Sequence, residues 1–217
     1  MQSHLRSRPL IAAALSVVFI ATPAGADEDV FAQFDIWVEA PSVVQDGDII
    51  DVAVWAKVSG PMLDIGINAM AGFRMNLPVA TSGNLVSEVE KPQFGLPYFY
   101  TWVADVNPTG IFDIGAHQPD LPELPIFTDN PILLYTTRLF TNEGETGLIE
   151  LLPERRDPTP EIIAWWIDTD DPSRPLVTDL DPNAELTITG KTIRVIPTPG
   201  TAALLALAGL GTLRRRR

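Results

Sequence analysis

Acidic side chains are the densest source of chemistry in this chain. Five aspartates crowd one stretch of the sequence, and they are Asp168, Asp170, Asp171, Asp179 and Asp181. Hard cations such as Ca²⁺ take several oxygen ligands from a flexible segment, so weak calcium binding is one prediction for this stretch. The EF-hand spacing is not met, because no glycine stands at its sixth position and no glutamate at its twelfth. A solvated acidic loop is the alternative, and no other cofactor is expected.

Catalytic chemistry has few candidates. A Ser-His-Asp site would depend on His117, which lies in a proline-rich stretch, and the chain has no Gly-x-Ser-x-Gly nucleophile motif. We therefore expect His117 to be an exposed loop residue. Paired carboxylates of a glycosidase could come from Glu143 with Glu145, or from Asp168 with Asp170. Acids are so abundant here that chance supplies such pairs, and we expect a protein without enzymatic activity.

Aromatic side chains suggest a third kind of chemistry, the stacking of sugar rings. If the segment "PYFYTWV" is a strand, Tyr98, Tyr100 and Trp102 share one of its faces. Trp165 and Trp166 are adjacent, so in a strand they point to opposite faces and one of them could be exposed. An exposed row of these rings would suit extracellular polysaccharide. The alternative is packing alone, in a strand central to a sandwich.

Composition excludes several classes of function. The 217 residues carry a formal net charge of −13 and no cysteine. Six of the 15 Lys and Arg lie near the two ends, so the middle of the chain holds nine against 28 Asp and Glu. Such a negative field repels nucleic acid. The lack of cysteine removes disulfides, thiolate nucleophiles and cysteine-ligated metals.

The middle of the chain, residues 27–195, alternates apolar and polar residues as half-buried strands do. In "DIIDVAVWAKV" one face would carry Ile50, Val52, Val54, Ala56 and Val58. Similar runs predict strands at residues 31–39, 67–77, 85–89, 97–106, 131–140, 147–152, 162–167 and 185–195. Turn-forming Gly and Pro residues separate these runs, and no amphipathic helix interrupts them. The pattern predicts one all-β domain, an antiparallel β-sandwich.

Three segments follow one another in a recognisable order: "PSVVQDGDIIDVAVWAKV", "PILLYTTRLF" and the closing "AELTITGKTIRV". This order of features resembles the cohesin-like branch of bacterial β-sandwiches. A jelly roll or another immunoglobulin-like sandwich fits the same pattern. Cohesin-like domains hold partner modules or sit in surface scaffolds, so the resemblance implies a surface protein as partner.

The N-terminus has the three parts of a secretory signal peptide. Arg6 and Arg8 precede an apolar run over residues 10–21, and a small-x-small site ends at Ala26. Residues 1–26 are therefore predicted to form a signal helix that is removed after export. A retained membrane anchor is the alternative, although the run is shorter than the roughly 20 residues that a spanning helix needs.

The C-terminal residues 196–217 combine a proline motif, an apolar segment and a basic end. The motif is Pro197, Thr198, Pro199 and Gly200, and the basic end is Arg214, Arg215, Arg216 and Arg217. Proline cannot enter a helix interior, so the motif should be extended. The segment 201–213 predicts a short hydrophobic helix, and the arginines would hold its end on the cytoplasmic side.

This ordered triple resembles the PEP-CTERM sorting signal of bacteria that produce exopolysaccharide, with Thr198 where that family usually has glutamate. The resemblance implies transient insertion in the inner membrane and recognition by an exosortase, a membrane-embedded transpeptidase-like enzyme. A plain tail anchor is the alternative.

Taken together, these features predict an exported protein of the cell surface or extracellular matrix with a structural or interaction role. A carbohydrate-binding module is the second hypothesis, and a glycoside-active enzyme is the third.

Overall fold

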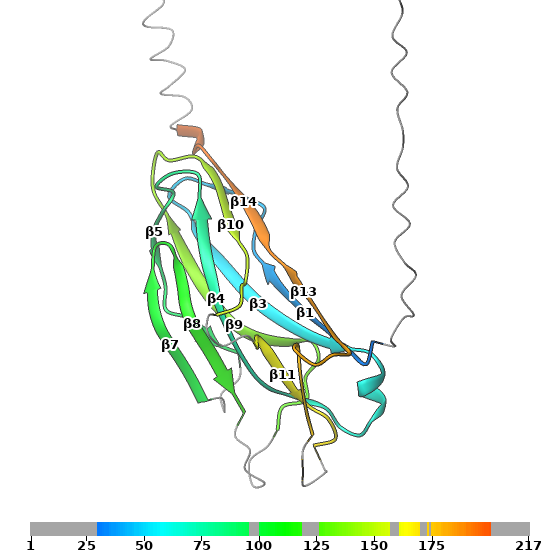
Figure 1. The fold of residues 1–217 in the computed structure, drawn as a ribbon. Helices are drawn as coiled ribbons and strands as arrows, with labels where there is room; N and C mark the ends of the chain where they lie inside the picture. The colour runs from blue at the N-terminus through cyan, green and yellow to red at the C-terminus, as the bar shows by residue number, and fades with distance from the viewer. Residues whose placement is uncertain are drawn as a thin grey trace, which may run out of the picture.

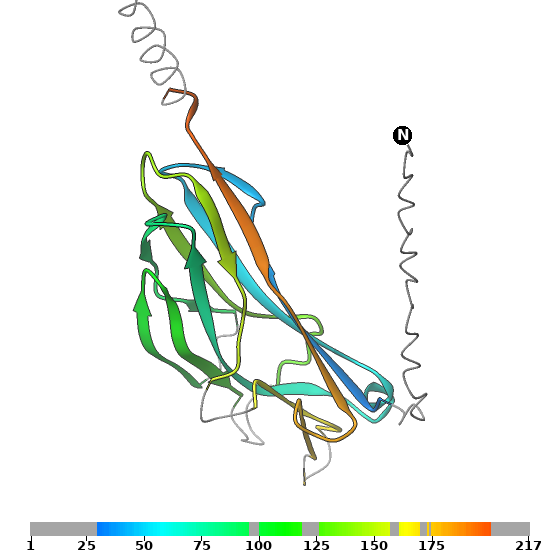
Figure 2. The same cartoon turned by 45° about the horizontal axis from the view of Figure 1, so that its top comes forward.

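The computed structural model describes residues 30–95, 100–118, 126–156, 161–169, 173 and 175–200. This part of the chain folds into two β-sheets that pack face to face (Figure 1). The two ends of the described chain lie at opposite ends of the sandwich, as Figures 1 and 2 show. The predicted helices at 10–21 and 201–213 lie outside the described residues. Within those residues we find no helix with the length and hydropathy of a membrane span.

The strands follow one another along the chain as β1 (Ala32–Glu39), β2 (Val43–Gln45), β3 (Ile49–Ser59), β4 (Ala69–Thr81), β5 (Val86–Val89), β6 (Gln93–Phe94), β7 (Tyr100–Asn107), β8 (Gly110–His117), β9 (Ile132–Thr141), β10 (Gly147–Leu151), β11 (Ile163–Trp166), β12 (Leu176–Thr178), β13 (Ala184–Thr189) and β14 (Lys191–Ile196). A single 3₁₀ turn, η1 (Pro61–Asp64), links β3 to β4. The prediction of an all-β sandwich is confirmed.

The first sheet has six strands in the order β13-β1-β3-β9-β5, with β6 also paired to β9. Apolar and polar residues alternate along its strands, so each strand turns its apolar face to the core. In β3 the five predicted inward residues, Ile50 through Val58, are at most 1% exposed, while Asp51 and Lys57 face solvent. The inward residues of β1 and β9 join them, so this sheet contributes one half of a continuous core.

The second sheet has eight strands and is organised by β4. One edge of β4 pairs with β8, and β8 in turn pairs with β7. The other edge is shared, because β11 pairs with the first residues of β4 and β10 with the last. Beyond β10 come β14 and β2. Strand β7 pairs only with β8 among the described strands, so it is an edge strand (Figure 1).

Three predictions about the strands are wrong. The sandwich is not wholly antiparallel, because β1 pairs with β13 and β14 with β2 in parallel. The single strand expected at 185–195 is two strands, which separate at Gly190 and enter different sheets. Strand β8 was not predicted, and it carries His117 as its last residue, so this histidine is not in a loop.

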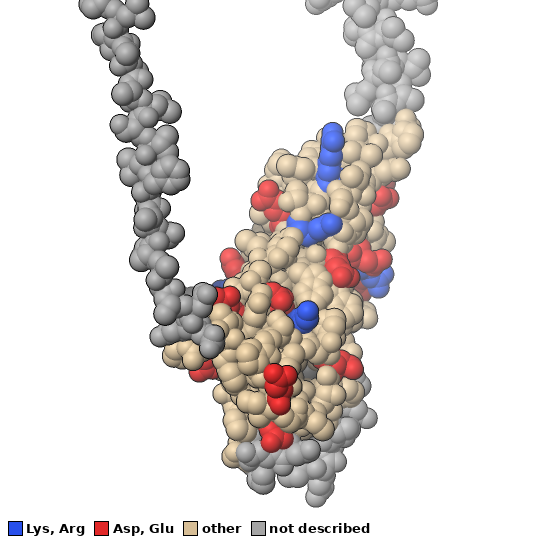
Figure 3. All heavy atoms as spheres, turned by 90° about the vertical axis from the view of Figure 1, so that its right-hand side faces the viewer, with Lys and Arg blue, Asp and Glu red and all other residues tan. Residues whose placement is uncertain are grey.

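Acidic side chains are spread over the side of the molecule that carries β13 and β14, with few Lys and Arg among them (Figure 3). This distribution matches the negative net charge of the sequence. It offers no continuous basic surface on this side.

Candidate functional site

The outer face of the eight-stranded sheet carries a polar cluster built around a β-bulge. Where β8 passes Asn76 of β4 the register shifts by one residue, and Asp113 takes a positive φ of 51°. The Asn76 side-chain oxygen accepts the Asp113 backbone N–H at 2.9 Å. Bulges re-aim side chains, and here the shift leaves the Asp113 carboxylate among side chains of the outer face.

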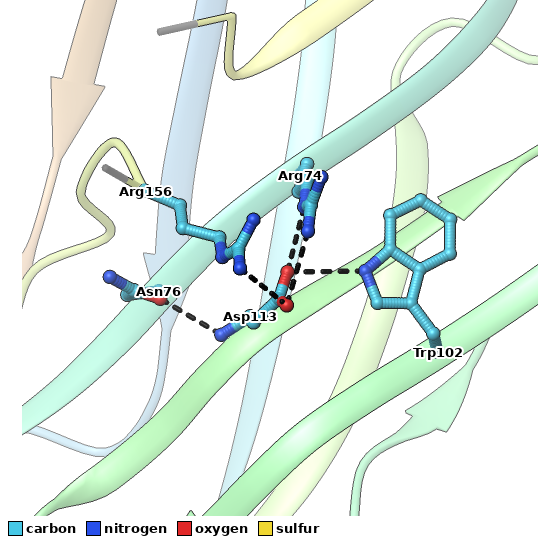
Figure 4. Close-up of polar contacts among 5 residues, drawn as sticks. All are labelled: Arg74, Asn76, Trp102, Asp113 and Arg156. Atoms are coloured by element: carbon cyan, nitrogen blue, oxygen red, sulfur yellow. Dashed lines mark hydrogen bonds and ion pairs between the residues drawn. The ribbon is translucent and has the colours of Figure 1, made fainter. Parts of the chain in front are cut away.

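Two arginines and one indole converge on the Asp113 carboxylate (Figure 4). Arg74 donates from Nε at 2.7 Å and from Nη2 at 3.1 Å, so its contact is bidentate. Arg156 approaches the second carboxylate oxygen at 3.0 Å, and Trp102 donates its Nε1–H to the first at 3.2 Å. The hydrogen bond from Arg74 is the main cause that lowers the pKa of Asp113. Partial burial opposes it, and Trp102 and Arg156 lower the pKa further by smaller amounts. The same contact raises the pKa of Arg74.

Aromatic rings extend this cluster toward the edge of the sheet. The Trp102 indole lies over Gly115, whose missing side chain leaves room for the ring. The Arg74 guanidinium stands over the same indole, 5.6 Å from its centroid. The His117 ring lies 6.1 Å from Trp102 and 5.1 Å from Tyr100, centroid to centroid. Tyr100 is 57% exposed, so the row ends in solvent.

A shallow hollow of about 200 Å³ opens beside these rings. Its lining includes Trp102 and His117 on one side and Glu161 and Ala164 on the other, with Gly72 of β4 between them. Aromatic, cationic and anionic groups therefore face one open surface. Such an arrangement can bind a partner, because it offers stacking surface and fixed hydrogen-bonding groups together.

The structure brings together two of the aromatic residues predicted to bind carbohydrate, Tyr100 and Trp102. Tyr98 lies outside the described residues. Trp165 and Trp166 do point to opposite faces, since they belong to different apolar clusters. They are 1% and 8% exposed, because neighbouring elements cover both faces of β11. The expectation that one of this pair is exposed is therefore wrong.

Two of the predicted calcium ligands, Asp179 and Asp181, have other partners. The Asp179 side chain is buried, accepts the backbone N–H groups of Ile162 and Ile163 at 2.8 and 3.0 Å, and forms an ion pair with Arg155. Asp181 accepts the backbone N–H of Thr178 in a turn.

Asp168 is the third described member of the acidic stretch, and Asp170 and Asp171 lie outside the described residues. Across the described ranges, no three His, Asp or Glu side chains are grouped as a metal site would need. Glu143 and Glu145 are exposed at the turn between β9 and β10.

The predicted sorting motif begins where the last strand ends. Strand β14 stops at Ile196, whose carbonyl accepts the Asp46 backbone N–H at 2.9 Å. The Asp46 carboxylate accepts the backbone N–H of Thr198, and also that of Gly144 at 2.7 Å. These bonds, that from Gly144 first, lower the pKa of Asp46. Thr198 is thus tied to the sandwich, whereas Arg214 to Arg217 lie outside the described residues.

Sequence reasoning missed Arg74, Asn76, Asp113 and Arg156. No motif links them, since Arg74 and Asp113 are 39 positions apart. One local signal existed, because Asp113 interrupts the apolar run "GIFDIGA" and a polar interruption of this kind is compatible with a bulge.

The fold defined by these strands is a two-sheet β-sandwich with mixed pairing. No protein-family model and no curated protein sequence matches the chain. Among solved structures it is similar to a cohesin module from a Clostridium perfringens family 33 glycoside hydrolase, with 8% identity, a TM-score of 0.48, and coverage of 76% of this chain and 98% of the other.

A type I cohesin–dockerin complex from Clostridium thermocellum gives 12% identity, a TM-score of 0.47 and coverage of 76% and 99%. A CARDB domain from Pyrococcus furiosus, solved with two metal ions, gives 11% identity, a TM-score of 0.35, and coverage of 78% of this chain and 97% of the other. These three TM-scores are all below 0.5, so we assign the fold class from the strand pairing of this chain alone.

Proposed function

We propose that this protein is exported and serves at the cell surface as a non-enzymatic binding module for another surface protein. The observation that carries the proposal is the exposed row of Tyr100, His117 and Trp102 beside the Arg74–Asp113 ion pair. Tyr, Trp and Arg are the residue types that dominate binding energy at protein interfaces. Here the carboxylate fixes the arginine in advance, so little side-chain entropy is lost on binding.

The edge of β7 favours a protein partner. Among the described strands, β7 pairs along one edge only, and its outer residues are largely exposed. A free edge offers backbone N–H and C=O groups to an added strand. A partner segment beside β7 would place its side chains next to Tyr100 and Trp102 of that strand.

Export and sorting form the second part of the proposal. Residues 1–26 would direct secretion, and an exosortase-like enzyme would process residues 196–217. The support is that the core of the described chain is built from residues between Ala32 and Val195, and that the proline motif follows directly after β14, the last strand. A tail beyond the last strand suits a segment that a membrane enzyme removes.

Site-specific crosslinking tests the binding role. A photo-crosslinking amino acid at Tyr100, in protein expressed by its native host, should give one covalent adduct with a surface protein. The same group at Glu185, an exposed position on β13 of the other sheet, is the matched control. Equal labelling from both positions, or none from Tyr100, would refute the proposed face.

Mass spectrometry of the native mature protein tests the route. We expect an N-terminus at Asp27 and a C-terminus that lacks the arginine cluster. A mature species that still ends in Arg217 would contradict processing of the C-terminal segment.

A further inference from the structure

The outer face of the six-stranded sheet carries a tryptophan pair that no prediction from sequence singled out. Trp37 of β1 and Trp55 of β3 are directly opposite in the register of the two strands. Their ring planes differ by only 11° and their centroids are 6.3 Å apart. Both side chains are partly exposed, and the Trp37 Nε1–H is held by Glu39 at 3.1 Å. The pair therefore places partly exposed aromatic surface on the outer face of this sheet.

A hollow of about 520 Å³ lies on the same sheet, and it is lined by residues that neighbour the pair, not by the indoles themselves. Residues two apart in a strand share a face, so Glu39 follows Trp37, and Ala53 precedes Trp55, on the same side of the sheet. Ala53 pairs with Thr136 of β9, and these short side chains form the floor. Ala53 and Thr136 are much smaller than the neighbouring tryptophans, so the surface is depressed at these two residues.

The rim of the hollow is polar and bears more negative than positive charge. Three carboxylates, from Glu39, Asp51 and Glu90, line it with two cations, Lys91 and Arg138. Arg138 is engaged by Glu90, with Nε and the carboxylate oxygen 2.8 Å apart. Glu39, Asp51 and Lys91 are exposed, which leaves two carboxylates and one ammonium to meet a ligand.

We propose that this surface binds a neutral polysaccharide chain. The C–H face of a pyranose ring stacks on an indole, and two nearly parallel indoles on neighbouring strands enlarge the surface on which a sugar can stack. Carboxylates, an ammonium and a threonine hydroxyl are the donors and acceptors that sugar hydroxyls require. The excess of carboxylate disfavours uronate or sulfate groups, since like charges repel. This inference goes beyond the proposed function and concerns the opposite sheet.

Native affinity electrophoresis of the intact chain tests it. The probes are hydroxyethylcellulose, galactomannan and xylan as neutral polymers, and alginate as an anionic polymer. We expect at least one neutral polymer to retard the protein, and alginate not to do so. Retardation by alginate alone, or by none of the neutral polymers, would overturn the proposal.

Two variants locate the site by different means. Trp37→Ala removes half of the aromatic surface, whereas Ala53→Phe keeps both indoles and fills the floor. Each should weaken binding at least tenfold, and each melting curve shows whether the protein is folded. Glu185→Ala, at an exposed position on β13 of the same sheet that does not line the hollow, should bind normally.

The outcomes separate the two proposals. If Trp37→Ala and Ala53→Phe both bind as the parent protein does, the surface assigned here is wrong. The Tyr100 crosslink reports on the other sheet, so it succeeds or fails independently of this result.

Discussion

Asp113 holds the outer-face cluster together at the scale of single residues. Its carboxylate meets Arg74 in two places, Arg156 and the Trp102 indole, and its backbone N–H is held by Asn76. The carboxylate therefore fixes groups from three separate segments. Its removal would leave two guanidinium groups close together without the anion between them.

Replacing Asp113 with Asn should lower stability by about 1–2 kcal/mol at pH 7. The pKa of Asp113 is lowered in the folded protein, so its contribution is present above the unfolded pKa of about 4 and is lost as pH falls through the folded value. The difference in the free energy of unfolding between the parent protein and Asp113→Asn should therefore become smaller in acid. Urea unfolding at several pH values measures it.

Asp51→Asn is the matched control, because Asp51 is exposed, and we expect it to change stability by less than about 0.5 kcal/mol. A gap for Asp113→Asn that stays constant from neutral pH into acid would show that the ion pair does not supply the stabilisation.

Residue-scale prediction from sequence succeeded where the signal was local. The alternation in "YTWV" placed Tyr100 and Trp102 on one strand. Arg74 and Asp113 meet only because β4 and β8 are neighbours, and a single sequence does not give that neighbourhood. The burial of Trp165 was missed for the same reason, since what covers each face of a strand is decided by tertiary packing.

At the scale of elements, close contact between β7 and β8 depends on a glycine. The Trp102 indole occupies the space that a side chain at Gly115 would need. Gly115→Ala should therefore displace the indole and cost about 1–3 kcal/mol. We expect a shift of tryptophan emission together with the loss of stability.

Gly200→Ala serves as the comparison, because an added methyl group there meets no neighbouring atom among the described residues. Unchanged stability and emission in Gly115→Ala would contradict the packing described for Trp102.

The connection of β14 to the tail gives another element-scale prediction. Asp46 ties Thr198 to the sandwich, so Asp46→Ala should expose the motif that follows Ile196. We expect limited proteolysis after Ile196 to accelerate several-fold, because cleavage requires local release of the backbone. Glu143→Ala, at an exposed residue that lines a hollow together with Asp46 and Thr198, should leave the rate unchanged. Equal rates in both variants would show that Asp46 does not hold the tail.

Strand prediction worked best where burial follows a strict period of two. In β3 alternate residues are buried almost without interruption, and the sequence shows the same alternation. In β8 the bulge at Asp113 breaks the period, so the strand was missed. The segment 185–195 alternates throughout, but Gly190 lets the chain pass from one sheet to the other, which the period cannot reveal.

At the scale of the whole molecule, one core joins both sheets. Because its described members lie between Ala32 and Val195, a chain limited to residues 27–200 should melt within about 2 °C of the full-length protein. Leu134→Ala, at a fully buried position of β9, should instead cost about 2–5 kcal/mol. Calorimetry on the three proteins decides this. A large loss on shortening would mean that the ends contribute to the fold.

The sandwich could be predicted from sequence, but its mixed pairing could not. Alternating apolar residues require two sheets that bury their inner faces against each other. Whether β13 lies parallel or antiparallel to β1 depends on which edge the returning chain reaches, and the alternation is the same in both cases. The parallel pairs therefore could not be predicted from the sequence and were found only in the structure.

Strand β14 also has a mechanical consequence. It is bonded along both edges, to β10 and to β2, and the chain continues from it toward the C-terminus. Tension applied through that end would run along the strand and load many hydrogen bonds at once, in shear. A sandwich pulled in this way resists far more strongly than one whose terminal strand peels off bond by bond.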